Sequence, residues 1–332
     1  MKQEYAISHW PDSKEILENL RVLANELPVY QINRSKMNEY LEKYESKFAK
    51  SKQMVALAKQ RIPGGVQHNL AFNYPFPLAI AKADGAYLYD VSGNRFIDFL
   101  QAGGPTVLGS NYKPVRDKVL ELINECGPVT GLFHEYEYKL ADLIYSHVPS
   151  VEMFRSLASG TEGCMAAIRA ARCFTDKKFV IKVGGGYHGW SDQFVFAMRI
   201  PGLGTLDSHG IPEGCFQYMQ EFYPNDTAAL EKLLKDNESK GGTAAVIVEP
   251  LGPESGTRPV HRDFNEKVKA LCDSYGTLLI FDEVVTGFRV GLGGAQGYFD
   301  IKPDLTVFGK CVAGGYPAAG GVGGRKEIML TF

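Results

Sequence analysis

The chain has 332 residues, and 36 Lys and Arg against 38 Asp and Glu give a formal net charge of −2. Hydrophobic residues make up 45% and charged residues 22%, as in ordinary globular proteins. This composition excludes a disordered chain, and the near-zero charge argues against nucleic acid or an anionic membrane surface as a partner. The length suits two domains, or one large domain with an appendage.

The six cysteines and seven histidines show no spacing typical of metal ligands, so we expect reduced thiols and no metal site. No run of about 18 apolar residues occurs, and the first residues lack the apolar segment of a signal peptide. These features predict a cytoplasmic protein without a membrane partner.

Residues 1–60 contain no glycine and carry apolar residues at helical intervals, which predicts a helical N-terminal arm of two or three helices. The sequence Arg-Ile-Pro-Gly-Gly at 61–65 breaks this pattern. Residues 86–90 and 95–99 alternate around Val-Ser-Gly-Asn, which predicts a hairpin. We assign residues 61–110 to the N-terminal part of a small domain.

From residue 111 to residue 332, predicted helices and strands alternate, which is typical of an α/β fold whose mostly parallel sheet has helices on both faces. Helical spacing occurs at 115–126, at 140–144, after Asp226 and from Asp263 to Gly276. Buried strands are expected at 179–183, 244–248, 277–281 and 305–308. Ligands of such sheets bind beyond the carboxyl ends of the strands, so the residues that follow the strands indicate the function.

Two glycine-containing segments are candidates for ligand binding. Ser159, Gly160 and Thr161 open a predicted helix, where backbone N–H groups and hydroxyls favour a phosphate, although a plain N-cap at Ser159 is the alternative. Gly184–Gly186 follow the strand at 179–183 and precede Tyr187, whose ring suits stacking on a flat ligand. The alternative for this segment is a glycine-rich surface turn.

Two further segments place ionisable residues after buried strands. Asp282 and Glu283 follow the strand at 277–281, where a buried carboxylate needs a cation or a donor; the alternative is a structural salt bridge. Lys310 follows the strand at 305–308, and a lysine in apolar surroundings becomes a nucleophilic amine able to form a Schiff base. A surface lysine with a partly buried stem is the alternative.

The four segments together match one ligand. They offer a phosphate site, a ring for stacking, a carboxylate for a ring cation and a lysine for an aldehyde. Pyridoxal 5′-phosphate (PLP) carries all four of these groups, so we expect it as the cofactor.

Several motifs add a family resemblance: Pro63-Gly-Gly-Val66, Ser159-Gly-Thr-Glu162, Tyr187-His-Gly189, Val248-Glu-Pro250, Phe281-Asp-Glu-Val284, Thr286-Gly-Phe-Arg289 and Gly309-Lys310. With them, the chain from about residue 60 onward resembles the class-III (subgroup II) PLP-dependent aminotransferases. The resemblance is to the branch that contains glutamate-1-semialdehyde 2,1-aminomutase.

The resemblance implies a fold-type I homodimer with its active site at the subunit interface, acting on a small-molecule amine or amino acid. It implies that Lys310 forms the Schiff base, that Asp282 pairs with the pyridine nitrogen and that Tyr187 stacks on the ring. It also implies further cofactor contacts from Ser159, Gly160, Thr161, His188, Glu254 and Val285.

Three departures from the family pattern affect the predicted substrate and domains. The aminomutase carries an arginine after Pro-Gly-Gly-Val that binds the substrate carboxylate, whereas this chain has Gln67-His-Asn69. Glu254 aligns with an asparagine of the aminomutase. The family continues well past the lysine region, so we expect a C-terminal small domain truncated at Phe332. The candidate substrate contacts are Gln67, His68 and Trp190.

The sequence leaves three functions open. The missing arginine favours a transaminase that acts on a less acidic or more apolar amine and uses Lys310. The alternative is glutamate-1-semialdehyde 2,1-aminomutase, which returns the amino group to the neighbouring carbon. A second alternative is a truncated, non-catalytic scaffold, which the end at Phe332 favours and the presence of Asp282 and Lys310 opposes.

Overall fold

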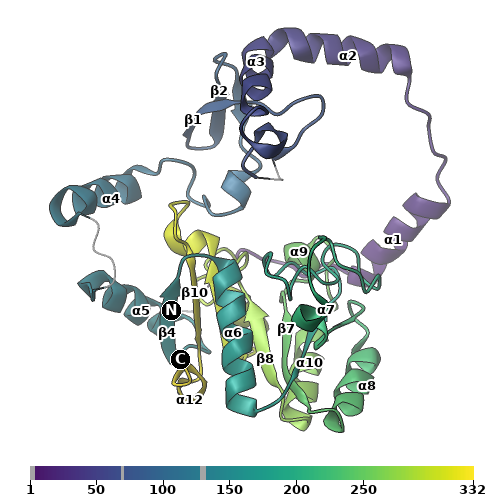
Figure 1. Ribbon diagram of the computed structural model, residues 1–332, viewed down its shortest axis with the longest axis vertical. Helices are drawn as coiled ribbons and strands as arrows, with labels where there is room; N and C mark the ends of the chain where they lie inside the picture. Colours follow the sequence, from purple (N-terminus) through teal and green to yellow (C-terminus); the bar gives the residue numbers. More distant parts are fainter. Residues whose placement is uncertain (1–3, 69–70, 128–131) are drawn as a thin grey trace. The chain divides into compact units, whose positions relative to one another are not determined.

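The computed structural model describes residues 4–68, 71–127 and 132–332 (Figure 1). The chain forms two compact units: a larger one of residues 1–20, 102–107 and 128–332, and a smaller one of residues 21–101 and 108–127. This division differs from the three segments expected from the sequence. The first residues belong to the larger unit because Trp10 packs against Phe299 and donates to the carbonyl of Val260 at 3.1 Å.

The larger unit is built on a seven-stranded sheet with the order β4-β10-β9-β8-β7-β5-β6. All strands run parallel except β10, which pairs antiparallel with β4 and β9. The expected α/β fold with a mostly parallel sheet is therefore confirmed. The strands are β4 (Met153–Leu157), β5 (Phe179–Val183), β6 (Met219–Phe222), β7 (Thr243–Val248), β8 (Leu278–Asp282), β9 (Leu305–Gly309) and β10 (Gly320–Gly324).

Helices cover both faces of this sheet (Figure 1). Alternate strand residues point to opposite faces, so Ile280 packs with α6 (Gly160–Thr175) and α12 (Lys326–Met329). Its neighbours Leu279 and Phe281 pack with α8 (Thr227–Glu238) and α10 (Phe264–Ser274). The remaining helices of this unit are α5 (Glu135–His147), α7 (Glu213–Phe216), α9 (Pro253–Gly256), α11 (Gly294–Phe299) and the 3₁₀ helix η4 (Lys310–Ala313).

The smaller unit contains a three-stranded antiparallel sheet. The expected hairpin is confirmed, because β2 (Tyr87–Asp90) and β3 (Arg95–Ile97) pair antiparallel. In the turn between them, Asp90 Oδ1 accepts the N–H groups of Ser92 and Asn94 at 2.9 and 2.8 Å. Its elements are α2 (Arg34–Lys47), α3 (Ala49–Ala58), η1 (Pro63–Gly65), β1 (Ile80–Asp84), β2 (Tyr87–Asp90), β3 (Arg95–Ile97) and α4 (Lys113–Cys126). Two elements cross the boundary between the units, α1 (Ser13–Asn25) and η3 (Gln101–Gly103).

Some apolar stripes that predict helices are exposed. Leu20 and Leu23 of α1 and Leu120 and Ile123 of α4 are all exposed, although both helices form as expected.

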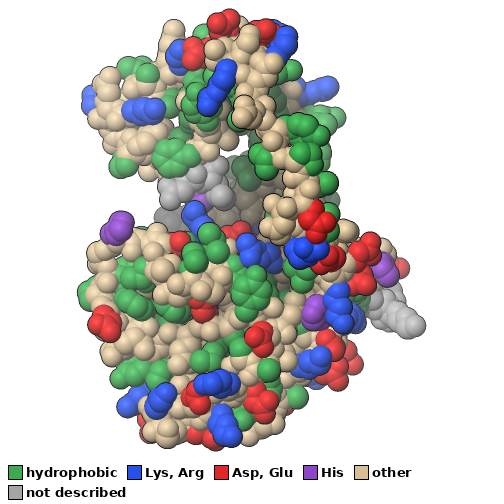
Figure 2. Space-filling view, turned by 90° about the vertical axis from the view of Figure 1, so that its right-hand side faces the viewer, with side chains coloured by type: hydrophobic (Ala, Val, Ile, Leu, Met, Phe, Trp, Pro, Cys, Tyr) green, Lys and Arg blue, Asp and Glu red, His purple; other side chains and the backbone are tan. Residues whose placement is uncertain are grey.

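On the face seen in Figure 2, acidic and basic side chains are interspersed, with no large patch of one sign.

Two expectations from composition concern membranes and thiols. All six cysteines are free in the structure. In the part of the chain that the structure describes, no helix combines the length and the apolar character needed to cross a bilayer.

Candidate functional site

The four segments that carry candidate chemistry follow four strands of the larger unit. Helix α6 follows β4, Gly184–Gly186 follow β5, Glu283 follows β8 and Lys310 follows β9. These four strands run in the same direction, so their carboxyl ends lie at one edge of the sheet. The sheet therefore brings all four segments to the edge where ligands of α/β folds bind.

Glycines allow these segments to approach one another closely. A β-carbon at Gly160 would lie 2.6 Å from Cγ2 of Val284, and one at Gly309 would lie 2.8 Å from Cγ1 of the same valine. Val284 therefore lies between the start of α6 and the end of β9. At Gly189, which has a φ of +93°, a β-carbon would collide with the side chain of Thr161. A larger residue at any of these glycines would push the segments apart.

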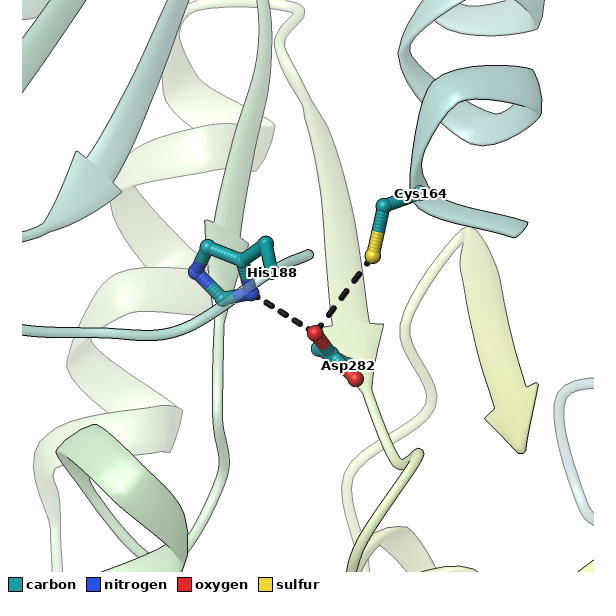
Figure 3. Close-up of side chains that lie close together, drawn as sticks. All are labelled: Cys164, His188 and Asp282. Carbon is teal, nitrogen blue, oxygen red and sulfur yellow. Dashed lines mark hydrogen bonds and ion pairs between the residues drawn. The ribbon is translucent and has the colours of Figure 1, made fainter. Parts of the chain in front are cut away.

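Asp282 is the centre of a buried polar cluster (Figure 3). Its Oδ2 lies 2.7 Å from Nδ1 of His188 and 3.4 Å from Sγ of Cys164. These partners come from the loop after β5 and from α6, so the cluster connects two of the four segments with β8. The other oxygen of Asp282, Oδ1, accepts the N–H of Val284 at 3.0 Å.

Both neighbours of Asp282 act as donors. Burial and the adjacent carboxylate of Asp282 raise the pKa of the Cys164 thiol well above its usual value, so the thiol keeps its proton. We assign a proton to Nδ1 of His188, because a carboxylate oxygen only accepts. The other ring nitrogen, Nε2 of His188, is buried and has no hydrogen-bond partner among the described residues.

Glu283 has a different environment, although it is the next residue. Its carboxylate accepts from Oγ1 of Thr286 at 2.8 Å, from the N–H of Ala295 at 2.6 Å, and from the N–H and Nε2 of Gln296 at 3.1 and 3.0 Å. Burial raises its pKa, and these donors oppose the rise. Glu283 thus connects the chain after β8 to α11 through neutral donors, and the described partners of this carboxylate do not include the salt bridge that the sequence left open as the alternative.

Lys310 begins η4 directly after β9, with a φ of +44°. A β-carbon at Gly104 would lie 3.4 Å from Cδ of Lys310, so the lysine stem runs along the backbone of Gly104. The carbonyl of Gly104 accepts from Nη1 of Arg289 at 3.1 Å and lies 3.6 Å from Sγ of Cys311. The sequence pattern did not indicate this segment, because residues 101–105 carry no charged side chain.

Ser159 is the N-cap of α6. Its Oγ accepts the N–H of Glu162 at 3.2 Å, and Oε2 of Glu162 accepts the N–H of Ala158 at 2.8 Å. The N-cap at Ser159 is therefore confirmed, and the phosphate role of this segment stays a prediction. The cap uses Oγ as an acceptor and leaves the hydroxyl proton able to donate. The dipole of α6 also favours an anion beside Gly160 and Thr161.

The other expected cofactor contacts differ in burial. Tyr187 is 43% exposed, and the burial of the rest of the side chain raises the pKa of its hydroxyl. Val285 is half-buried, and Trp190 is 76% exposed. Glu254 lies in α9 with a φ of +48°, and its N–H donates to Oε1 of Glu249 at 2.9 Å. Glu249 stands in the motif Val248-Glu-Pro250, but nothing in the sequence assigned it a role.

The expected substrate contacts Gln67 and His68 lie in the smaller unit, shortly after η1. The neighbouring Asn69 and Leu70 lie outside the described residues. The substrate role of Gln67 and His68 stays a prediction.

Cys164, His188 and Asp282 also form a group of potential metal ligands, with ligand atoms within 4.8 Å of one another in the described part of the chain. Sequence spacing could not indicate this group, because His188 and Cys164 are 94 and 118 residues away from Asp282. The two hydrogen bonds to Asp282 explain the proximity without an ion, and the absence of a metal site stays a prediction.

A sheet edge that combines a capped helix, a buried aspartate and a lysine is the architecture of PLP-dependent proteins of fold type I. The family model described as aminotransferase class-III matches residues 70–332, and the chain belongs to this family. Glutamate-1-semialdehyde 2,1-aminomutase 2 of Lachnoclostridium phytofermentans is 41% identical to it over 285 residues, which cover 84% of this chain and 66% of the relative.

Solved structures have the same fold. An omega-transaminase from Sphaerobacter thermophilus matches with a TM-score of 0.79 and 30% identity, over 85% of this chain and 65% of the other. A transaminase with PLP bound matches with a TM-score of 0.78 and 30% identity, over 86% of this chain and 66% of the other. The chain thus spans about two thirds of the length of the proteins that it matches.

Proposed function

We propose that this protein binds PLP at the carboxyl edge of the sheet and transfers an amino group between small molecules. The observation that carries the proposal is the placement of Asp282 and Lys310 at the ends of the neighbouring strands β8 and β9. Membership of the class-III family and the PLP bound to a solved neighbour support it. When bound, PLP supplies an aldehyde that condenses with amines and a ring that withdraws electrons.

The residues present fit this cofactor. Asp282 is a buried carboxylate whose described partners are His188, Cys164 and the N–H of Val284, so it can also pair with a protonated ring nitrogen. Tyr187 keeps part of its ring exposed for stacking. The capped start of α6 keeps donors for a phosphate.

Each residue then has a distinct task. Asp282 holds a proton on the ring nitrogen, while His188 and Cys164 hold its carboxylate in place. Lys310 would supply the amine that holds the cofactor aldehyde, and its Nζ would accept and return a proton. Tyr187 stacks on the ring. The other proposed contacts are Ser159, Gly160 and Thr161 for the phosphate, and Glu254 and Val285 for the ring.

We propose a transaminase as the reaction, with glutamate-1-semialdehyde 2,1-aminomutase as the second candidate. Gln67 and His68 offer single donors, whereas an arginine would offer two parallel donors that match a carboxylate. The second candidate is supported by the 41% identical relative that carries this name.

Steady-state kinetics of the full-length protein distinguish the two reactions. We expect kcat/KM for an apolar arylalkylamine with a 2-oxo acid to exceed that for glutamate-1-semialdehyde at least about tenfold, equivalent to about 1.4 kcal/mol. Gln67→Arg should reduce this preference. Efficient formation of 5-aminolevulinate contradicts the transaminase and supports the aminomutase. A protein that binds PLP but turns over neither substrate supports the scaffold.

We also propose that the protein is a cytoplasmic homodimer with its active site at the subunit interface. The exposed Leu120 and Ile123 of α4 support a partner surface, and six free cysteines fit a reducing compartment. Light scattering on the full-length protein tests the dimer. The mass of a single subunit at micromolar concentration contradicts it.

A further inference from the structure

One peptide group in the loop after β5 is held between two buried side chains of opposite charge. Lys182 is fully buried, and its Nζ donates to the carbonyl of Gly186 at 2.7 Å and to that of Phe196 at 3.0 Å. Glu249 is also buried, and its Oε1 accepts the N–H of Tyr187 at 2.8 Å. The carbonyl of Gly186 and the N–H of Tyr187 are the two ends of the same peptide group.

The two charges match the dipole of this peptide group. The ammonium lies at the oxygen end and the carboxylate lies at the N–H end, so both stabilise the same orientation. Burial lowers the pKa of Lys182 to about 8, against the opposing effect of Glu249. Because a peptide group is planar, fixing both of its ends also fixes the direction in which the chain enters Tyr187.

Glu249 also holds the turn at α9. Its Oε2 accepts the N–H and the hydroxyl of Ser255, and its Oε1 accepts the N–H of Glu254 at 2.9 Å. Glu254 and Ser255 have φ values of +48° and +55°, which residues other than glycine rarely adopt. Successive N–H groups in a turn of this kind form a nest for an anion, and the carboxylate of Glu249 occupies it. Glu249 therefore connects the turn of Glu254 with the loop of Tyr187.

The held peptide group immediately precedes two residues of the proposed cofactor site, Tyr187 and His188. A β-carbon at Gly186 would lie 3.1 Å from Nε2 of His188 and 3.5 Å from Oε1 of Glu249, so the loop, the imidazole and the carboxylate pack closely. His188 in turn bonds to Asp282. A rotation of the peptide group would move both the stacking ring and the partner of Asp282.

We propose that Lys182 and Glu249 form a charge clamp on the Gly186–Tyr187 peptide group and thereby position Tyr187 and His188 for the cofactor. The part that concerns the cofactor rests on the proposed function. Lys182 and Glu249 are positioning residues that act through the backbone of the loop. The alternative is a buried polar network that contributes stability alone.

The test compares Glu249→Gln, Lys182→Met and the double variant of the full-length protein with Asp304→Asn. Asp304 is a matched control, because it is a buried carboxylate that accepts the N–H of Leu279 at 2.8 Å. It precedes β9 and therefore lies at the opposite edge of the sheet. Urea unfolding of each variant measures the accompanying loss of stability.

We expect each clamp variant to weaken PLP binding at least about tenfold and to shift the visible absorption maximum of the bound cofactor. We expect Asp304→Asn to change neither. The PLP affinity of the double variant should be about the same as that of the single variant with the lower affinity, because both charges act on one peptide group.

A second readout does not need the cofactor. The chain has two tryptophans, so Trp10→Phe leaves Trp190 as the only one, three residues after Tyr187. In this background we expect the fluorescence anisotropy of Trp190 to fall in the clamp variants, because the loop becomes more mobile. It should stay unchanged in Asp304→Asn.

The outcomes separate the clamp from the proposed function. Unchanged PLP affinity, visible spectrum and Trp190 anisotropy in Glu249→Gln overturn the clamp. Changes of the same size in Asp304→Asn also overturn it. So does a double variant whose loss of PLP affinity is the product of the losses in the two single variants. If the wild-type protein does not bind PLP but the anisotropy falls only in the clamp variants, the cofactor proposal fails and the clamp stands.

Discussion

Asp282 and Glu283 are adjacent, both are buried, and their surroundings are different. Side chains alternate between the two faces of β8, and the side chain of Asp282 lies on the face of α6, where it bonds to Cys164 and His188. The carboxylate of Glu283 instead accepts N–H groups at the start of α11. A charged group buried at the end of a strand predicts a strong partner, but it does not predict which partner. The different partners imply different effects of the two isosteric amide variants.

Asp282→Asn should leave the fold intact and slow amino transfer. The amide keeps the shape of the side chain but removes the charge that holds a proton on the ring nitrogen. We expect single-turnover kinetics to show a rate at least about a hundredfold lower, equivalent to about 2.7 kcal/mol. Glu283→Gln is the control and should mainly lower the free energy of unfolding. A near-wild-type rate in Asp282→Asn means that another group protonates the ring.

Lys182 should make stability depend on alkaline pH. Burial lowers its pKa from 10.5 to about 8, while Glu249, Glu221, Asp207 and Cys164 oppose the change. At pH values between these two pKa values, Lys182 binds a proton in the unfolded chain but not in the folded chain. The contribution of Lys182 to the free energy of unfolding therefore increases with pH in this range. Relative to Lys182→Met, the wild type should gain about 2 kcal/mol between pH 7.5 and 9.5.

Urea unfolding at both pH values measures this gain. Lys302→Met, which removes an exposed lysine, is the control and should show no dependence of the difference on pH. A constant difference between wild type and Lys182→Met would show that the lysine has the same pKa in the folded and unfolded states.

The sequence predicts the functional residues that end a strand, but it does not predict the residues that act through the backbone. Asp282 and Lys310 were identified because they follow apolar runs that form buried strands. Lys182 lies inside the strand at 179–183, and its partner carbonyl is four residues away. Glu249 bonds to an N–H that is 62 residues away. Only the fold shows that these two charges meet one peptide group.

Among the elements, β10 is the clearest difference between sequence and structure. Its sequence, Gly-Gly-Val-Gly-Gly, has a single β-branched residue, Val322, among four glycines, and glycine is depleted in strands. At the glycine positions of this strand, the neighbouring residues leave no room for side chains. A β-carbon at Gly320 would collide with the backbone of Ser159, and one at Gly321 would collide with the ring of Phe154.

Gly320→Ala should therefore destabilise the protein. The added methyl pushes against the backbone of the N-cap of α6, and overpacking of this kind costs about 1–3 kcal/mol. Gly214→Ala in α7 is the control, because the nearest atom to its added methyl is Nε2 of Gln217 at 3.8 Å. It should be neutral or slightly stabilising. Equal stability of both variants in urea would contradict the close packing of β10 on α6.

Helices show the limit of periodicity as a predictor. The apolar spacing at 115–126 predicts α4 to within two residues, but Leu120 and Ile123 are exposed. By contrast, the stripe on α6 includes Ile168 and Ala171, which are buried against the sheet. Periodicity indicates that one face of a helix is apolar, and it carries no information on what covers that face.

For the whole molecule, the alternation of helices and apolar strands was enough to predict the α/β class and the mostly parallel sheet. The division into units was not predictable, because residues 102–107 belong to the larger unit while the chain on both sides belongs to the smaller one. No break in composition marks these boundaries. The boundaries of the units depend on contacts in the folded chain, such as the contact between the side-chain stem of Lys310 and the backbone of Gly104.

In the site that we propose, Lys310 holds PLP at the edge of this sheet. The most direct measurement is borohydride reduction of the PLP-loaded full-length protein, which adds hydride to the bond between the cofactor and its lysine, followed by peptide mapping with mass spectrometry. We predict that the cofactor mass appears on the peptide containing Lys310 and is absent in Lys310→Ala. A label on the buried Lys182 or on any other lysine, or no label on protein that has bound PLP, would contradict this role of Lys310.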